Sequence, residues 1–393
     1  LPPFLGQLRD WQGVFALQMK VGIHKGRFFA AQLGTSQDSE RNRGGAPYGR
    51  IEYALFGADV NRTAKAESAA LAGQILVNQE TYEAITLPCH TTSAPPNAPS
   101  YLVVEEIEPL PILPYASSPT LPYATEPTLD SLHRFTELLD ALAPYLPAGI
   151  LARIASDPVP ITGRAMNTVS LEGEHRLVAV LFANVRGLGE IADKLGPGHE
   201  AQIETALNRY FVAMGESIHR FGGVINKIDL YDHGDKLLAF FGAPLAHEDD
   251  AERAARAGLA MQEALAEIAH TLPAQIGLLN LSLDQRIGIS FGYVFAGYVG
   301  TSWRHEYTVM GDEVNLAARL MATAEPDDII VSSDIRRKVQ TLFELEPRGE
   351  VALKGKSNLV PIFQIVGPRA MPEPLYGLKG MHSPLVGRQA EWE

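Results

Sequence analysis

The sequence predicts an α+β protein in which helices pack on a sheet, and three observations support this prediction. A continuous apolar run, Leu177–Ala183, has the length and composition of a buried strand. Leu207, Phe211 and Met214 recur at helical spacing soon afterwards. Strand-like and helix-like segments then follow one another with glycine-marked turns between them, which is typical of helices covering a sheet.

The remaining elements of this region follow in chain order. We expect strands at Lys236–Phe241 and Ile329–Ser332, and helices at Ala251–Ile268 and Val314–Ala322. The alanine-rich helix carries its larger apolar residues, such as Met261 and Leu265, on one stripe. Between the two helices, Arg286–Gly292 and Val294–Val299 are expected to form a strand pair that turns at Gly292.

The composition of the chain limits the classes of function that we expect. The chain has 393 residues, of which 46% are hydrophobic and 20% charged, as in globular proteins of two or three domains. Lys and Arg number 33 against 46 Asp and Glu, a formal net charge of −13. Nucleic acid is therefore not an expected partner, nor is an anionic membrane surface. No apolar run approaches the roughly 18 residues that a membrane helix needs, so we expect no membrane span.

The cysteine content and the first residue add two expectations. Cys89 is the single cysteine, which excludes an intramolecular disulfide and favours a reducing, cytoplasmic location. The first residue is Leu1 rather than methionine. We expect the chain to be an internal fragment of a longer protein.

An internal repeat is the strongest organisational signal. Val21-Gly22-Ile23 matches Ile287-Gly288-Ile289 at an offset of 266 residues. A longer loop in the first copy, Thr35–Arg50, lowers the offset to 254, so that Ile75-Leu76-Val77 matches Ile329-Ile330-Val331. Matching blocks in one order predict two homologous domains, of which only the C-terminal half of the first is present.

Proline separates these domains. The stretch Pro109–Pro127 is expected to be a linker with polyproline character, followed by a helix over Leu129–Ala155 that is broken at Pro144 and Pro147. We expect a half domain over residues 1–108, a Pro-rich linker and connecting helix over 109–170, a complete domain over 171–368, and a linker with the start of a further domain over 369–393.

The stretch Glu306–Leu320 carries the main candidate functional residues. Asn315 and Arg319 lie four residues apart on a predicted helix and so project from one face. A positioned arginine beside an amide is what phosphoryl chemistry needs to hold developing negative charge. Alone, such a pair is usually a solvated helix face. Its context, downstream of Gly222–Lys227 (GGVINK) and Gly288–Gly300, favours the functional interpretation.

This order of motifs resembles the class III nucleotidyl cyclases, which form cyclic AMP or cyclic GMP. It is most similar to the tandem, bicarbonate-responsive soluble adenylyl cyclases. The resemblance covers Leu171–Gly367 nearly end to end and Phe15–Ile85 in the first copy. It implies ferredoxin-like cyclase domains paired head to tail, the first copy incomplete, with the active site at their interface.

The resemblance also implies a role for each matching residue of the second domain. Lys227 and Thr308 would read the adenine, Asn315 would position the ribose, and Arg319 would stabilise the charged transition state. A lysine with a hydroxyl partner fits ATP better than GTP, which disfavours a guanylyl cyclase. The expected reaction converts ATP to 3′,5′-cyclic AMP and pyrophosphate with two Mg²⁺ or Mn²⁺ ions.

The metal-binding side of the family's site is not matched in the second domain. Asn184 stands where the first metal aspartate is expected, and Asp235 corresponds to the second. One carboxylate is a poor two-metal site for a hard cation. The resemblance therefore implies that the metal ligands belong to the front half of the first domain, before residue 1.

The retained half of the first domain is degenerate. Ala54 stands at the position that matches Thr308, and Lys65 at the position that matches Arg319, while Asn61 is kept. This second site is not expected to catalyse. The resemblance to the soluble enzymes suggests bicarbonate as a regulatory ligand at Lys65 or nearby Arg62, whereas a solvated or structural lysine is the default interpretation.

A second functional interpretation stays open. The substitutions at Asn184, Ala54 and Lys65 also fit a catalytically silent, nucleotide-sensing pair. Such a pair would regulate a downstream ATPase, and Ser383–Glu391 resembles the opening of a signalling ATPase domain.

The segment His247–Asp250 looks like a metal-binding cluster, but we expect it to be the acidic start of a helix.

Overall fold

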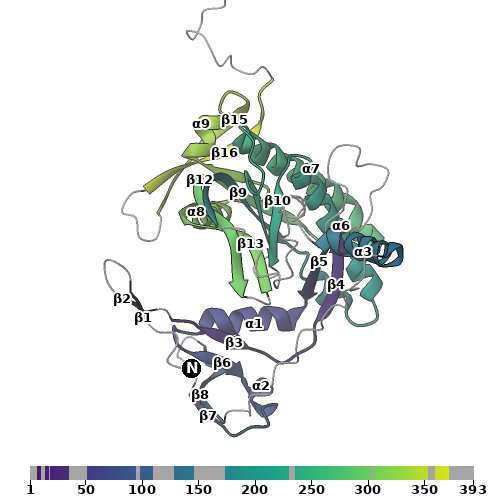
Figure 1. Cartoon of the computed structure of the whole chain (residues 1–393), viewed down its shortest axis with the longest axis vertical. Coiled ribbons are helices and arrows are strands. Elements are labelled where there is room, and N and C mark those ends of the chain that lie inside the picture. The colour runs from purple at the N-terminus through teal and green to yellow at the C-terminus, as the bar shows by residue number, and fades with distance from the viewer. Residues whose placement is uncertain are drawn as a thin grey trace, which may run out of the picture.

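An eight-stranded mixed sheet forms the core of the second copy, and helices pack against it (Figure 1). The computed structural model describes residues 7–9, 14–16, 18–34, 51–93, 98–108, 128–145, 173–229, 235–301, 304–352 and 359–370. The first copy contributes β1 (Gln7–Arg9), β2 (Val14–Ala16), β3 (Val21–Ile23), β4 (Phe29–Gly34), β5 (Ile51–Phe56), α1 (Ala58–Ala69), β6 (Ile75–Asn78), α2 (Gln79–Glu83), β7 (Cys89–Thr92) and β8 (Tyr101–Ile107).

The connecting region contributes α3 (Leu129–Leu142) and η1 (Ala143–Tyr145). The second copy contributes β9 (Glu174–Arg186), α5 (Ile191–Leu195), α6 (Glu200–His219), β10 (Val224–Asp229), β11 (Asp235–Phe241), α7 (Asp250–Ile276), β12 (Asp284–Thr301), β13 (Arg304–Met310), α8 (Asp312–Thr323), β14 (Ile329–Ser332), α9 (Ser333–Val339), β15 (Phe343–Ala352) and β16 (Leu359–Pro368). The strands and helices expected in this copy are confirmed, apart from one turn described below.

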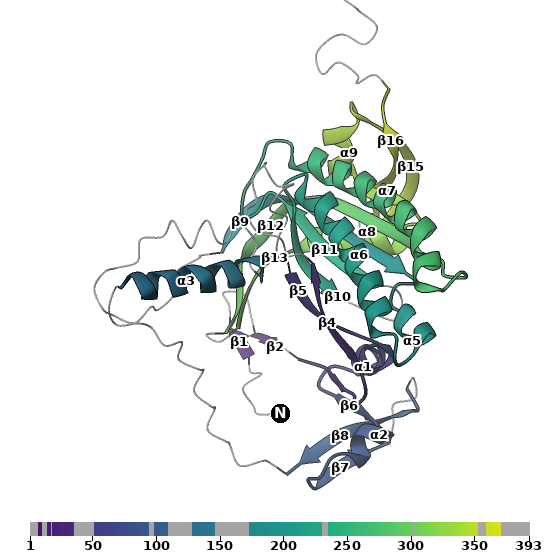
Figure 2. The ribbon, with the colours of Figure 1, turned by 90° about the vertical axis from the view of Figure 1, so that its right-hand side faces the viewer.

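The apolar run at Leu177–Ala183 lies in β9, inside the strand order β10-β11-β9-β12-β14-β16-β15, with β13 paired to β12. Leu181 packs in one cluster with residues of α6 and α7. Val180 packs in another, with residues of β13 and α8. Alternate side chains of a strand point to opposite faces, so β9 is buried on both from Val178 onward, which explains most of its uninterrupted run. Leu177, at the start of the run, is 44% exposed. Figure 2 shows α6 and α7 side by side on one face of this sheet.

The expected turn at Gly292 is wrong. β12 continues through this residue, and Gly292 pairs with Val178 of β9. The glycine lies under the Glu313 side chain instead, because a Cβ there would lie 2.8 Å from Cγ of Glu313 at the start of α8 and would displace that side chain. The hairpin partner of the second half of β12 is β13, with Phe295 opposite Met310.

Both copies of the repeat pair their strands in the same register. β3 pairs with β6 in parallel, Val21 opposite Ile75, and β12 pairs with β14 in parallel, Ile287 opposite Ile329. The helix that follows β6 is capped by Asn78, and the one that follows β14 by Ser332, the matching residue. The two matched segments therefore have the same local topology.

The matched glycines of the repeat allow a helix to lie directly on a strand. A Cβ on Gly288 would lie 2.2 Å from the backbone nitrogen of Met321 in α8, and a Cβ on Gly22 would lie 2.2 Å from that of Glu67 in α1. We expect Gly288→Ala to lower the free energy of unfolding by about 3 kcal/mol or more, because backbone cannot yield as a side chain can. Chemical denaturation would measure this loss.

Gly367→Ala is the matched control, because no atom lies within 4 Å of the Cβ that it would add in β16. We expect it to change stability by less than about 0.5 kcal/mol. Equal stability of the two variants would contradict the close approach of α8 to β12.

The β4–β5 hairpin of the first copy packs on the second copy. Leu33 and Phe56 lie in the same buried cluster as Leu207 and Phe211 of α6. The backbone N–H of Gly34 donates a hydrogen bond to Oδ1 of Asn208 at 2.7 Å. Figures 1 and 2 both show the hairpin beside α6. The two copies are therefore joined by apolar contacts as well as by the chain.

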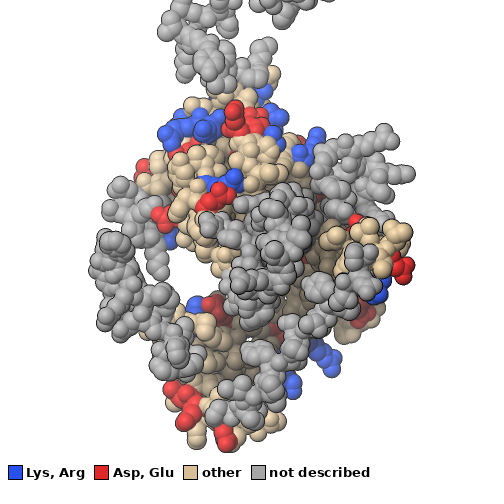
Figure 3. Space-filling view, viewed as in Figure 1, with Lys and Arg blue, Asp and Glu red and all other residues tan. Residues whose placement is uncertain are grey.

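The predicted connecting helix is confirmed from Leu129 to Leu142, where Thr128 and Ser131 form a capping box. The predicted break at Pro144 falls in η1, and residues 146–155 lie outside the described part of the structure, as do the linker at Pro109–Pro127 and the segment Ser383–Glu391. Among the residues that the structure describes, no helix combines the length and hydropathy needed to cross a membrane. Basic side chains at the α9–β15 end lie beside acidic ones on the face drawn in Figure 3.

Candidate functional site

The segment from β13 to α8 carries three of the predicted functional residues. Thr308 lies on β13, and Asn315 and Arg319 lie on α8, with Gly311 between the two elements. The apolar face of α8 (Leu316, Ala317, Leu320 and Met321) is buried. Asn315 is exposed and Arg319 is half-buried, so both lie off that face. A polar ligand next to α8 could contact both side chains.

The hydroxyl of Thr308 is held by a neighbouring strand. Oγ1 of Thr308 donates a hydrogen bond to Oδ1 of Asn226 on β10 at 3.0 Å. Nδ2 of Asn226 donates to the backbone carbonyl of Tyr307 at 2.7 Å. The backbone of Lys227 follows directly in β10, and its side chain lies outside the described part of the structure. The fold thus brings the strand of Lys227 beside Thr308.

Asn184 and Asp235 meet at the paired ends of β9 and β11. Asn184 is 5% exposed and Asp235 is 4% exposed. Nδ2 of Asn184 donates to the backbone carbonyl of Asp235 at 3.4 Å, a bond that an aspartate could not make. Asp235 also lies near the phenol of Tyr210, whose pKa is raised by burial and, less, by that carboxylate. The Tyr210 hydroxyl donates to Oε1 of Gln285 at 2.7 Å.

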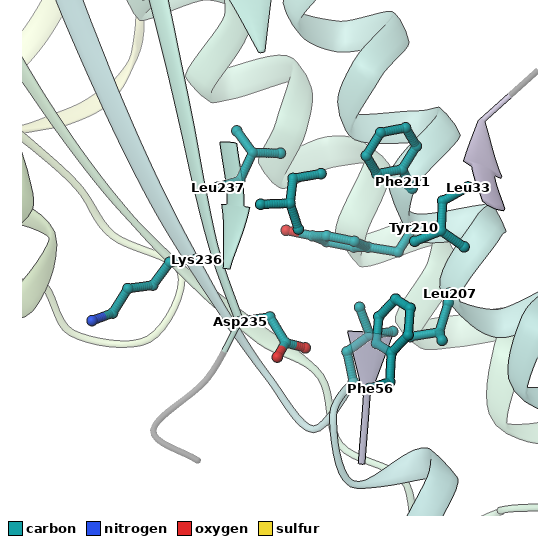
Figure 4. A pocket seen from close by; sticks show the side chains of 10 residues that line it. Leu33, Phe56, Leu207, Tyr210, Phe211, Asp235, Lys236 and Leu237 are labelled. Atoms are coloured by element: carbon teal, nitrogen blue, oxygen red, sulfur yellow. The ribbon is translucent and has the colours of Figure 1, made fainter. Parts of the chain in front are cut away.

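A small cavity opens between Asp235 and the hairpin of the first copy (Figure 4). Its volume is about 10 Å³, enough for roughly one water molecule and far too small for a nucleotide. Its walls are mainly apolar, and Phe56 and Leu33 come from the first copy. In Figure 4 Asp235 points toward Tyr210 and Phe56, while Lys236 points away.

These residues do not fit a two-metal centre. Asp235 is a single carboxylate in mainly apolar surroundings, and the amide of Asn184 is turned toward a backbone carbonyl. Throughout the described part of the chain, no three His, Cys, Asp or Glu side chains gather closely enough to bind a metal ion. The His247–Asp250 segment instead starts α7, where Asp250 accepts hydrogen bonds from the backbone N–H and the ring of His247.

The candidate residues of the first copy lie at positions that match those of the second. Ala54 is buried on β5 opposite Ala31, as Thr308 lies opposite Gly297 on β12. Asn61 is half-buried on α1, and Lys65 is exposed one turn later.

A polar cluster around Asp59 was not predicted from the sequence. Its Oδ1 accepts hydrogen bonds from Nε2 of His24 at 3.0 Å and from Nη1 of Arg62 at 2.6 Å. Its Oδ2 accepts from the backbone N–H of Arg27. Burial alone would raise the pKa of Asp59, but these hydrogen bonds together lower it below its ordinary value. The second copy has Glu313 at this position, so the repeat comparison could have drawn attention to it.

We expect Asp59→Asn to destabilise the first copy at neutral pH by about 1–3 kcal/mol, because charge-assisted hydrogen bonds are lost. A carboxyl whose pKa is lowered by folding stabilises the protein above its unfolded pKa, and this contribution disappears as pH falls through the folded pKa. The difference between variant and wild type should therefore be full above about pH 5 and vanish in stronger acid. Thermal denaturation across a pH series would measure it.

Glu263→Gln, an exposed position on α7, serves as the control and should change stability little at any pH. A loss in Asp59→Asn that persists undiminished in acid would contradict the proposed role of the carboxylate charge.

Asn226 is the functional candidate that sequence reasoning missed. It lies within the motif Gly222–Lys227, but no feature of a single strand shows that its side chain contacts β13, which is 81 residues away. The signal is structural: the pairing of β10 with β11 shifts between Ile225 and Lys227, which leaves Asn226 in a bulge.

The chain matches the family described as the adenylate and guanylate cyclase catalytic domain, over residues 9–96 and 172–366. These two ranges make up more than half of the chain, and each covers one copy of the repeat. The chain therefore belongs to the adenylate and guanylate cyclase catalytic domain family.

Individual relatives include uncharacterized proteins and an adenylate cyclase. An uncharacterized protein of Mycobacterium tuberculosis is 35% identical over 167 residues, 42% of this chain and 28% of that protein. Adenylate cyclase 1 of Rhizobium meliloti is 29% identical over 192 residues, 48% of this chain and 27% of that protein. The chain thus spans only about a quarter of the length of these relatives.

Two solved structures are also similar. The adenylyl cyclase CyaB of P. aeruginosa is 31% identical with a TM-score of 0.46, and the match covers 51% of this chain and 98% of that one. The guanylyl cyclase Cya2 is 31% identical with a TM-score of 0.44, covering 50% of this chain and 95% of that one.

Proposed function

We propose that this chain is the core of an adenylate cyclase that converts ATP to 3′,5′-cyclic AMP and pyrophosphate in intracellular signalling. The observation that carries the proposal is the continuous β13–α8 segment. It places the hydroxyl of Thr308 beside β10, the strand of Lys227, and it carries the amide of Asn315 and the guanidinium of Arg319 on the helix that follows. The family membership of the chain supports the reaction class.

In the proposed reaction the 3′-oxygen of ATP attacks the α-phosphorus in line. The bond from that phosphorus to the pyrophosphate oxygen breaks, and the 3′-hydroxyl loses its proton. Lys227 and Thr308 hold the adenine, and Asn315 orients the ribose. Arg319 stabilises the negative charge that grows on the phosphate oxygens, because a fixed guanidinium needs no reorganisation at that moment.

Divalent cations such as Mg²⁺ or Mn²⁺ would supply Lewis-acid activation of the nucleophile and screening of the phosphates. We assign two such ions to the reaction but to none of the described residues, since Asn184 and Asp235 do not fit them.

The same proposal includes the head-to-tail pairing of two cyclase domains. It also includes bicarbonate as a regulator near Lys65 and a signalling ATPase domain that begins near residue 383. The contact of the β4–β5 hairpin with α6 supports the pairing.

The test is turnover by the full-length protein, with ATP and with GTP, in the presence of Mg²⁺ or Mn²⁺. We expect cyclic AMP from ATP and little cyclic GMP from GTP. Binding of ATP without any product would overturn the catalytic proposal. It would favour a silent nucleotide-sensing pair, which the buried amide of Asn184 also fits.

A further inference from the structure

Asn226 occupies a β-bulge between two paired residues of β10. Ile225 lies opposite Ala239 of β11 and Lys227 opposite Leu238, so Asn226 has no partner of its own in the ladder. A bulge turns a side chain away from the regular alternation of a strand and often lies next to an active site. Here it allows the amide of Asn226 to reach β13.

The orientation of the Asn226 amide follows from its two contacts. Nδ2 lies 2.7 Å from the carbonyl oxygen of Tyr307, which can only accept. Reversing the amide would place two acceptors at that distance, so Oδ1 must face Thr308. The Tyr307 ring is 8% exposed and packs edge-on against Tyr298, with 5.4 Å between ring centroids. The carbonyl that orients Asn226 is therefore part of a well-packed strand.

This orientation determines which way the Thr308 hydroxyl points. Oδ1 of Asn226 is an acceptor, so the hydroxyl of Thr308 donates its one hydrogen to it, at 3.0 Å between the oxygens. What Thr308 offers to a ligand is then its lone pairs. The exocyclic amine of adenine donates hydrogen bonds, whereas the O6 of guanine accepts them. A hydroxyl fixed as an acceptor therefore attracts the amine of adenine and repels the O6 of guanine.

We propose that Asn226 is a specificity-determining positioning residue, which holds the hydroxyl of Thr308 as an acceptor and so favours adenine over guanine nucleotides. This inference rests on the proposed function, because it assumes that Thr308 contacts the base. It assigns the choice of base to a side chain that need not touch the nucleotide.

The experiment compares Asn226→Ala, Thr308→Val and the double variant with the wild-type protein. ATP and GTP would compete against a fluorescent ATP analogue, and kcat/KM would be measured for both nucleotides. We expect Asn226→Ala to lower the preference for ATP over GTP by about 5- to 10-fold, the effect of one oriented hydrogen bond. Asn226→Ala should cause no further loss in the Thr308→Val background, because the two residues act through one hydroxyl.

Asn226→Asp separates the role of Asn226 in orienting the Thr308 hydroxyl from its role in stabilising the fold. It keeps an acceptor toward Thr308 but loses the amide donor to the Tyr307 carbonyl. We expect it to keep most of the ATP preference while lowering the melting temperature. Gln262→Ala is the matched control, because Nε2 of Gln262 donates in the same way to the carbonyl of Gln285, on β12. It should affect stability without changing the preference.

The outcomes distinguish the two proposals. A wild-type protein that discriminates, together with an Asn226→Ala variant of unchanged ATP-to-GTP ratio, would overturn the role of Asn226 and leave the proposed function intact. Equal losses for both nucleotides in Asn226→Ala and Asn226→Asp would also overturn it, since a purely structural role predicts that pattern. A wild-type protein that binds neither nucleotide would overturn the proposed function and this inference with it.

Discussion

Arg319→Ala should lower kcat for cyclic AMP formation by roughly 10²-fold or more, by analogy with other arginines of phosphoryl transfer. Arg319 lies half-buried on α8, one turn after Asn315. The substitution removes a positive charge from the place where negative charge grows in the transition state, so the loss should fall mainly on kcat rather than KM. Steady-state turnover of ATP would measure it.

Lys65→Ala is the control that the repeat provides. Lys65 occupies the matching position on α1 of the first copy and is exposed there. We expect nearly unchanged turnover in this variant when the assay contains no bicarbonate. Equal losses in both variants would mean that the two helices contribute similarly and that our assignment of the catalytic side is wrong.

Phe56→Ala should release the β4–β5 hairpin from α6. The Phe56 ring is 3% exposed, lies 6.3 Å from the Phe29 ring between centroids, and helps to enclose the cavity beside Tyr210. Replacing a buried phenylalanine by alanine usually costs about 3–5 kcal/mol. We expect faster amide hydrogen exchange in β4 and β5 and a lower melting temperature.

Tyr53→Ala on the same strand is the matched control, because the Tyr53 side chain is 65% exposed. It should leave exchange in the hairpin nearly unchanged. Undiminished protection of β4 and β5 in Phe56→Ala would show that the hairpin does not depend on this contact.

Much of the second copy could be predicted because its signals are local. The apolar run of β9 and the stripe of α7 reflect burial against neighbours, whichever neighbours these are. Gly292 was misinterpreted because glycine marks both turns and close approaches. Only the packing of Glu313 against β12 distinguishes the two.

The sequence by itself determined the repeat, the order of its elements and the residues that resemble a cyclase site. Tertiary structure decided which of these residues meet. Asn226 reaches Thr308 across 82 residues of chain, and Gly34 reaches Asn208 across 174. The Asn226–Thr308 contact depends on a β-bulge, and the Gly34–Asn208 contact depends on the docking of a hairpin. Such long-range geometry leaves no periodic pattern in a single sequence. The physical reason is that hydrophobic patterning specifies which face is buried, whereas the directions of individual hydrogen bonds are set only when the strands come together.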